Sequence, residues 1–169
     1  MTLVEAAAIA SVVGIVLAVF VPTFWRELRT SKVEEASQVL GQIHERMAAY
    51  YEAEHGTLRH CLPSPAGPTP AEASMDGLEV DLTADATGGA TWAALDLGLT
   101  RPLRYRYEVV PLREGCDIRV RPGESLFVLR ATGDLDGDGR MSRFERVATV
   151  DEDGNVVPHG VLFVEDRME

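Results

Sequence analysis

The sequence predicts an α+β fold in which one long N-terminal helix packs on an antiparallel β-sheet of about four strands. Two patterns predict it. The first third of the 169-residue chain reads as an apolar helix that continues into an amphipathic one. Beyond it, short segments of alternating apolar and polar residues are separated by turn residues, which is typical of antiparallel strands. We divide the chain into an apolar helix half (1–25), an amphipathic helix half (26–55) and a β head (56–169).

The apolar half carries no charge over residues 6–25, about the 20 residues that a helix needs to cross a bilayer. A cleaved signal peptide fits poorly, because no basic region precedes the apolar run. The first basic residues, Arg26, Arg29 and Lys32, follow it and would hold the head in the cytoplasm. A disulfide and a calcium loop favour the other side, and a basic leader removed before Met1 would resolve the conflict.

Three residues are unusual in a membrane anchor. Glu5 costs several kcal/mol in lipid unless it finds a cation, and the amine of Met1, in this or a neighbouring copy, is the nearest one. Alternatively, Glu5 lies at the headgroups and favours the helix dipole. Gly14 costs roughly 1 kcal/mol in a helix and Pro22 about 3, so the stretch between them either unwinds readily or merely kinks.

Together these features resemble the mature N-terminus of type IV pilins and the related pseudopilins. The matching residues are Thr2, Leu3, Glu5, Gly14 and Pro22, in "TLVE", "VVGIV" and "FVPTF". The resemblance implies the type IV pilin fold, cleavage by a prepilin peptidase and N-methylation of Met1. It also implies a single-pass subunit of the inner membrane that pilus assembly machinery lifts into an extracellular filament, the fimbrium. In such homopolymers Glu5 pairs with the N-terminal amine of a neighbouring subunit.

The amphipathic half shows apolar residues at alternating steps of three and four, which predicts one helical face against a sheet and a helix ending near residue 54. Gly56 is a plausible stop. The proline-rich segment 61–74 is expected to lack regular structure, and 90–99 to form a short helix with Trp92 in the core. The apolar stripe consists of Val33, Ala36, Leu40, Ile43, Met47 and Tyr50.

Four strand-like segments follow. Residues 103–109 alternate Leu, Tyr, Tyr and Val with charged residues, and 116–120 and 125–132 read as the next two strands. Residues 146–157 predict a hairpin around Asp153 and Gly154.

Cys61 and Cys116 are the two cysteines. In a cytosolic protein they would be unrelated buried thiols, whereas in an exported head one disulfide is the better interpretation. It would tie the connection after the helix to the sheet.

Residues 134–145, "DLDGDGRMSRFE", have the spacing of a twelve-residue calcium loop. Gly139 stands at its sixth position, where the loop must turn sharply. Strand-like sequence on both sides indicates an EF-hand-like loop inserted between strands, with a structural Ca²⁺ as cofactor. A solvated acidic turn is the alternative. The expected ligands are the carboxylates of Asp134, Asp136, Asp138 and Glu145, the Arg140 carbonyl, and Ser142 directly or through water.

A net charge of −11 argues against nucleic acid as the main partner, because phosphate contacts need clustered Lys and Arg. The sequence shows no nucleophile motif, no phosphate-binding glycine loop and no clustered histidines. We therefore expect that the protein is not an enzyme and has no catalytic residues. The resemblance of the N-terminus therefore implies a type IV pilin serving adhesion or motility. A pseudopilin of a type II secretion system, or a monomeric membrane-tethered calcium-binding module, remains the alternative.

Overall fold

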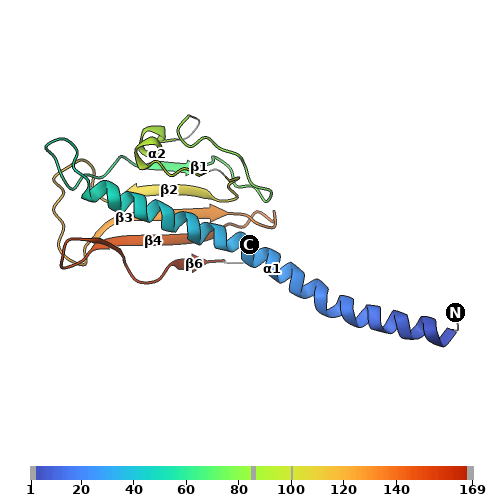
Figure 1. Cartoon of the computed structure of the whole chain (residues 1–169). Helices are drawn as coiled ribbons and strands as arrows, with labels where there is room; N and C mark the ends of the chain where they lie inside the picture. The colour runs from blue at the N-terminus through green and yellow to red at the C-terminus, as the bar shows by residue number, and fades with distance from the viewer. Residues whose placement is uncertain (1–2, 85–86, 100, 167–169) are drawn as a thin grey trace.

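The computed structural model describes the chain over residues 3–84, 87–99 and 101–166. Within helix α1, the side chains of Leu3, Ala6, Ala8 and residues 25–33 lie outside this description. Helix α1 (Leu3–Glu52) runs along one face of a single antiparallel sheet, and its N-terminal half extends beyond the sheet (Figure 1). The head is therefore a sheet covered on one face by the second half of the helix.

The second half of α1 forms because apolar residues recur at helical spacing, and this stripe packs on the sheet. At the end of the stripe, Tyr51 is buried whereas Tyr50 is only half-buried, so the helix presents the second tyrosine to the core. Val33, predicted to begin the stripe, lies outside the described side chains. The buried residues of this face are Ala36, Val39, Leu40, Ile43, Met47 and Tyr51.

The predicted fold class was wrong in its sheet, which has six strands rather than about four. The strands follow the order β1-β2-β3-β4-β5 in one antiparallel sheet, and β6 pairs with the edge of β4 on which β5 also lies. Figure 1 labels β1, β2, β3, β4 and β6 of this sheet. Short edge strands that pair with only one neighbour carry little pattern of their own, so the sequence does not reveal them. The strands are β1 (Ala66–Thr69), β2 (Arg106–Pro111), β3 (Ser125–Gly133), β4 (Ser142–Val150), β5 (Val156–Pro158) and β6 (Phe163–Glu165).

Two local predictions were also wrong. The proline-rich connection contains β1, which pairs with β2, so part of it is regular structure. Residues 116–120, predicted as a strand, form no strand and instead belong to the connection between β2 and β3. In that connection the amides of Asp117 and Ile118 donate to the carbonyls of Arg59 and His60, at 2.8 and 3.1 Å, instead of joining the sheet ladder.

Helix α2 (Gly89–Leu95) covers the β1 side of the head. Its Trp92 is 1% exposed, and the indole Nε1 donates to Thr69 Oγ1 at 3.2 Å. Tryptophan buried with its N–H satisfied contributes large apolar area at no polar cost. Trp92 therefore anchors α2 to β1 and to the core.

Candidate functional site

The N-terminal half of α1 carries large apolar side chains that the rest of the described chain does not cover. They are 45–77% exposed and lie on all sides of the helix. An apolar surface of this extent marks contact with another protein or with lipid. We name these residues the apolar stem: Val4, Ile9, Val12, Val13, Ile15, Val16, Leu17, Val19, Phe20, Val21 and Phe24.

The polar residues of the stem keep their hydrogen bonds within the helix. The hydroxyls of Ser11 and Thr23 each donate to a carbonyl four residues earlier, at 2.9 Å, so neither presents an open donor to apolar surroundings. A Cβ built on Gly14 would meet no heavy atom within 4 Å, which leaves room for another helix to approach closely. Pro22 lies inside α1, and the stretch from Gly14 to Pro22 is helical in this structure.

Two predictions for this segment fall partly outside the described residues. Glu5 is exposed in the first turn of α1, where the helix dipole favours a carboxylate. Met1, whose amine is its predicted partner, is not among the described residues. The predicted membrane span at 6–25 includes side chains that are not described, and within the described part of the chain no helix is long and apolar enough to count as a membrane span.

A buried carboxylate that sequence reasoning missed joins α1 to the sheet. Glu35 is 5% exposed and accepts hydrogen bonds from the backbone amide of Arg104 at 2.8 Å and from its Nη1 at 3.0 Å. The hydroxyl of Tyr107 donates to the same carboxylate at 3.3 Å. Burial and the Glu35 charge raise the pKa of Tyr107 above its ordinary value, so the phenol stays protonated and remains a donor. The helical spacing could have revealed Glu35, since Glu35 and the buried Val39 and Ile43 follow one another at steps of four and so share one face.

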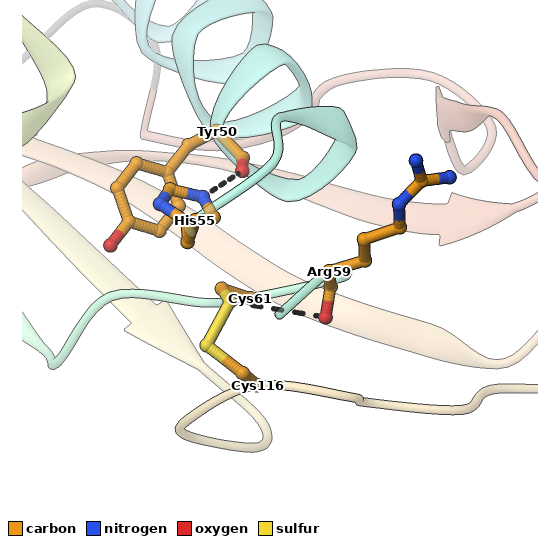
Figure 2. Close-up of a disulfide and its surroundings, with 5 residues drawn as sticks. All are labelled: Tyr50, His55, Arg59, Cys61 and Cys116. Atoms are coloured by element: carbon orange, nitrogen blue, oxygen red, sulfur yellow. Dashed lines mark hydrogen bonds between the residues drawn. A yellow bond between two sulfur atoms is a disulfide. The ribbon is translucent and has the colours of Figure 1, made fainter. Parts of the chain in front are cut away.

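At the other end of the head, a disulfide holds the chain where it leaves α1. Cys61 and Cys116 are joined across 55 residues of sequence, and the amide of Leu62 donates to the Gly115 carbonyl at 2.8 Å beside them. Figure 2 shows the bridge close to the end of the helix, where His55 Nε2 lies 2.8 Å from the Tyr50 carbonyl. The bridge thus ties the segment after α1 to the connection between β2 and β3.

The acidic loop between β3 and β4 brings three predicted ligands together. Carboxylate oxygens of Asp134, Asp136 and Asp138 all lie within 4.8 Å of one another. The amides of Gly137 and Gly139 donate to the two Asp134 oxygens at 2.6 and 3.0 Å, which folds the loop around that side chain. Both glycines have positive φ, 79° and 90°, a conformation that other residues rarely adopt.

Arg140, whose carbonyl is the fourth predicted ligand, continues the same turn, and its amide donates to Asp138 Oδ1 at 2.8 Å. Its guanidinium is exposed, with Nε 3.9 Å from Asp138 Oδ2.

Glu145 is not among the residues of this cluster, and both Glu145 and Ser142 belong to β4. Glu145 accepts from Arg130 Nε at 2.5 Å and Arg143 Nη2 at 2.7 Å; burial opposes its ionisation, but these bonds hold its pKa below the ordinary value. Ser142 is fully buried and donates to the Gly133 carbonyl at 2.9 Å. The described acidic cluster therefore consists of three aspartates.

Comparison with known proteins adds no assignment to these features. No protein-family model, curated protein or solved structure matches the chain.

Proposed function

We propose that the protein is the subunit of an extracellular filament of the type IV pilin kind, which polymerises through its N-terminal helix. The observation that carries the proposal is the apolar stem, uncovered along its length and continuous with a helix that anchors a folded head. The stems of many copies can pack together while the head attached to each stem stays in water. Before assembly the stem would rest in the inner membrane, from which pilus assembly machinery would lift it after processing by a prepilin peptidase.

The energetics favour a packed bundle with a charge pair. Transfer of the stem from lipid into a bundle of stems gains little hydrophobic free energy, because lipid tails are equally apolar. Close helix packing must then favour assembly, and Gly14 supplies a site without a side chain for it. Glu5 on the same surface would add specificity by pairing with the terminal amine of a neighbouring Met1, since a carboxylate among apolar helices requires a cation.

Substitution of Glu5 by alanine is expected to abolish or strongly reduce filaments sheared from cells, while the head folds normally. Glu34→Ala is the matched control, because Glu34 is an exposed acid on the same helix outside the apolar stem. Negative-stain electron microscopy and immunoblotting of the sheared fraction measure the outcome. Filaments made equally well by the Glu5→Ala variant would contradict the proposed pairing.

The same preparations separate the alternatives. A pseudopilin would form short periplasmic fibres only when a type II secretion apparatus is present. A tethered calcium-binding module would remain monomeric in membranes and would tolerate Glu5→Ala. Long surface filaments that contain this chain would support the pilin.

We further propose that the acidic loop binds one structural Ca²⁺. Three converging carboxylates repel one another, and hard carboxylate and carbonyl oxygens are the ligands that Ca²⁺ prefers. Asp134, Asp136, Asp138 and the Arg140 carbonyl would hold the ion, and water would complete its six to eight ligands. Because Glu145 is bonded to two arginines, the site has fewer protein ligands than the full motif. We therefore expect a weak site with a Kd on the order of 10⁻³ M, and Ca²⁺ would occupy this site in calcium-rich surroundings.

Calcium is expected to stabilise the head. At a concentration roughly ten times Kd it should add about 1.4 kcal/mol, which raises Tm by about 3–6 °C for a chain of this size. Thermal unfolding with Ca²⁺ and then with EDTA measures the difference. Asp136→Asn should remove the response, whereas Glu145→Gln should keep it. An unchanged Tm on chelation would exclude the calcium site, and loss of the response in Glu145→Gln would show that Glu145 is a ligand after all.

A further inference from the structure

Three exposed arginines line a hollow of about 650 Å³ in the connection between β2 and β3. The disulfide ties this connection to the segment after α1, at the end of the helix away from the apolar stem (Figure 2). We name this feature the arginine hollow, and its lining residues are Arg113, Arg119, Arg121, Pro122 and Glu124.

Backbone hydrogen bonds fix the two sides of the hollow. Arg113 follows the end of β2 and Glu124 precedes the start of β3, and these ends lie together because the two strands are antiparallel neighbours. The amide of Glu124 donates to the Arg121 carbonyl at 2.9 Å, which closes a turn between them. Within this turn, the amide of Gly123 donates at 2.8 Å to the carbonyl of Val150 at the end of β4. The sheet therefore holds the backbone that carries these arginines.

Glu124 balances one of the three positive charges that line the hollow. Its carboxylate forms an ion pair with Arg113 and accepts from the Arg121 amide at 3.1 Å. Arg113 also donates from Nη1 to the Arg119 carbonyl at 3.3 Å. The guanidinium groups of Arg119 and Arg121 have no hydrogen-bond or ion-pair partner in the part of the chain that the structure describes. The lining of the hollow therefore carries an excess of two positive charges.

The two guanidinium groups without partners suit an anion that carries several oxygens. A guanidinium presents planar N–H donors that match the oxygens of sulfate or phosphate, and such ionic bonds are about twice as strong as neutral hydrogen bonds. A chain with a net charge of −11 repels anions overall, so the hollow is a local exception. A compact anion fits this exception better than nucleic acid, whose binding requires phosphate contacts along an extended surface.

We propose that the arginine hollow binds a tetrahedral oxyanion group, sulfate or phosphate, between the guanidinium groups of Arg119 and Arg121. Arg113, which Glu124 holds in place, forms the wall beside this group. The group is either a free ion or a substituent of an anionic polymer, and both present the same oxygens to the arginines. The inference rests on the head alone, so a failure of filament assembly would leave it intact.

Nuclear magnetic resonance of the full chain in mild detergent tests the binding through the Nε–H signals of the arginines. The probes are inorganic sulfate, dextran sulfate and unmodified dextran, at an ionic strength of about 0.1 M, which screens charges farther apart than about 10 Å. We expect a saturable shift of the Arg119 and Arg121 signals with inorganic sulfate if the free ion suffices, or with dextran sulfate alone if the polymer is required. The absence of a saturable shift with both sulfate probes, or an equal shift with unmodified dextran, would overturn the proposal.

Variants of the lining separate a site from a general effect of charge. Arg119→Gln and Arg121→Gln should each weaken binding about tenfold, because each removes one charge-assisted contact. Glu124→Gln should tighten it about threefold, since it removes the negative charge from the lining and keeps an acceptor for the Arg121 amide. Arg59→Gln is the matched control, because Arg59 is exposed at the same end of the head but does not line the hollow. Equal weakening in Arg59→Gln, or binding that does not tighten in Glu124→Gln, would overturn the proposal.

Discussion

Replacement of Glu35 by alanine is expected to lower the free energy of unfolding by about 2–4 kcal/mol, the range for breaking a buried ion pair whose partner is partly exposed. The carboxylate is 5% exposed and serves three donors from Arg104 and Tyr107. Its removal leaves the Tyr107 hydroxyl and the Arg104 amide without their acceptor in the buried contact between α1 and the sheet. The cost is therefore larger than the energy of any one bond.

Urea unfolding of the full chain in mild detergent, followed by far-UV circular dichroism, measures this loss. Glu54→Ala is the control, because Glu54 pairs with Arg59 where both side chains are more than 60% exposed, and such a pair contributes at most about 1 kcal/mol. Glu35→Gln, which keeps an acceptor but not the charge, should fall between the two. Equal midpoints for Glu35→Ala and Glu54→Ala would show that the buried contact does not hold the helix on the head.

Loss of the disulfide is the second large expected effect. Substitution of both Cys61 and Cys116 by serine should cost about 2–5 kcal/mol, because the bridge closes a long loop and thereby restricts the unfolded chain. The double variant avoids a lone thiol that would form intermolecular bridges. Since the bridge joins the segment after α1 to the connection between β2 and β3, we expect that end of the head to open first.

Chemical reduction provides an independent comparison. Dithiothreitol should lower the urea midpoint of the wild-type chain to that of the Cys61→Ser and Cys116→Ser double variant, and it should leave the double variant unchanged. A wild-type chain whose midpoint does not respond to reduction would contradict a stabilising role for the bridge.

Local periodicity determined the parts of this fold that depend on neighbouring residues in the chain. The stripe containing Leu40 and Ile43 has the period of a helix, and both residues are buried against the sheet. Tyr107 and Val109 alternate with charged residues and are likewise buried along β2. The spacing of Asp134, Asp136 and Asp138 brings their carboxylates together because two glycines allow the turn between them.

Long-range pairing decided the rest. β1 is a strand because β2 offers it a partner, and 116–120 is not one, because the disulfide and the bonds to Arg59 and His60 hold that segment away from the ladder. Glu145 has the right position for a calcium ligand in sequence but the wrong one in space. In a helix after the loop its side chain would turn back toward the metal, whereas in β4 the alternation of the strand directs it to Arg130 on the neighbouring strand. The sequence by itself determined the helical and strand periods of the apolar residues, and tertiary structure alone decided which distant groups the side chains contact.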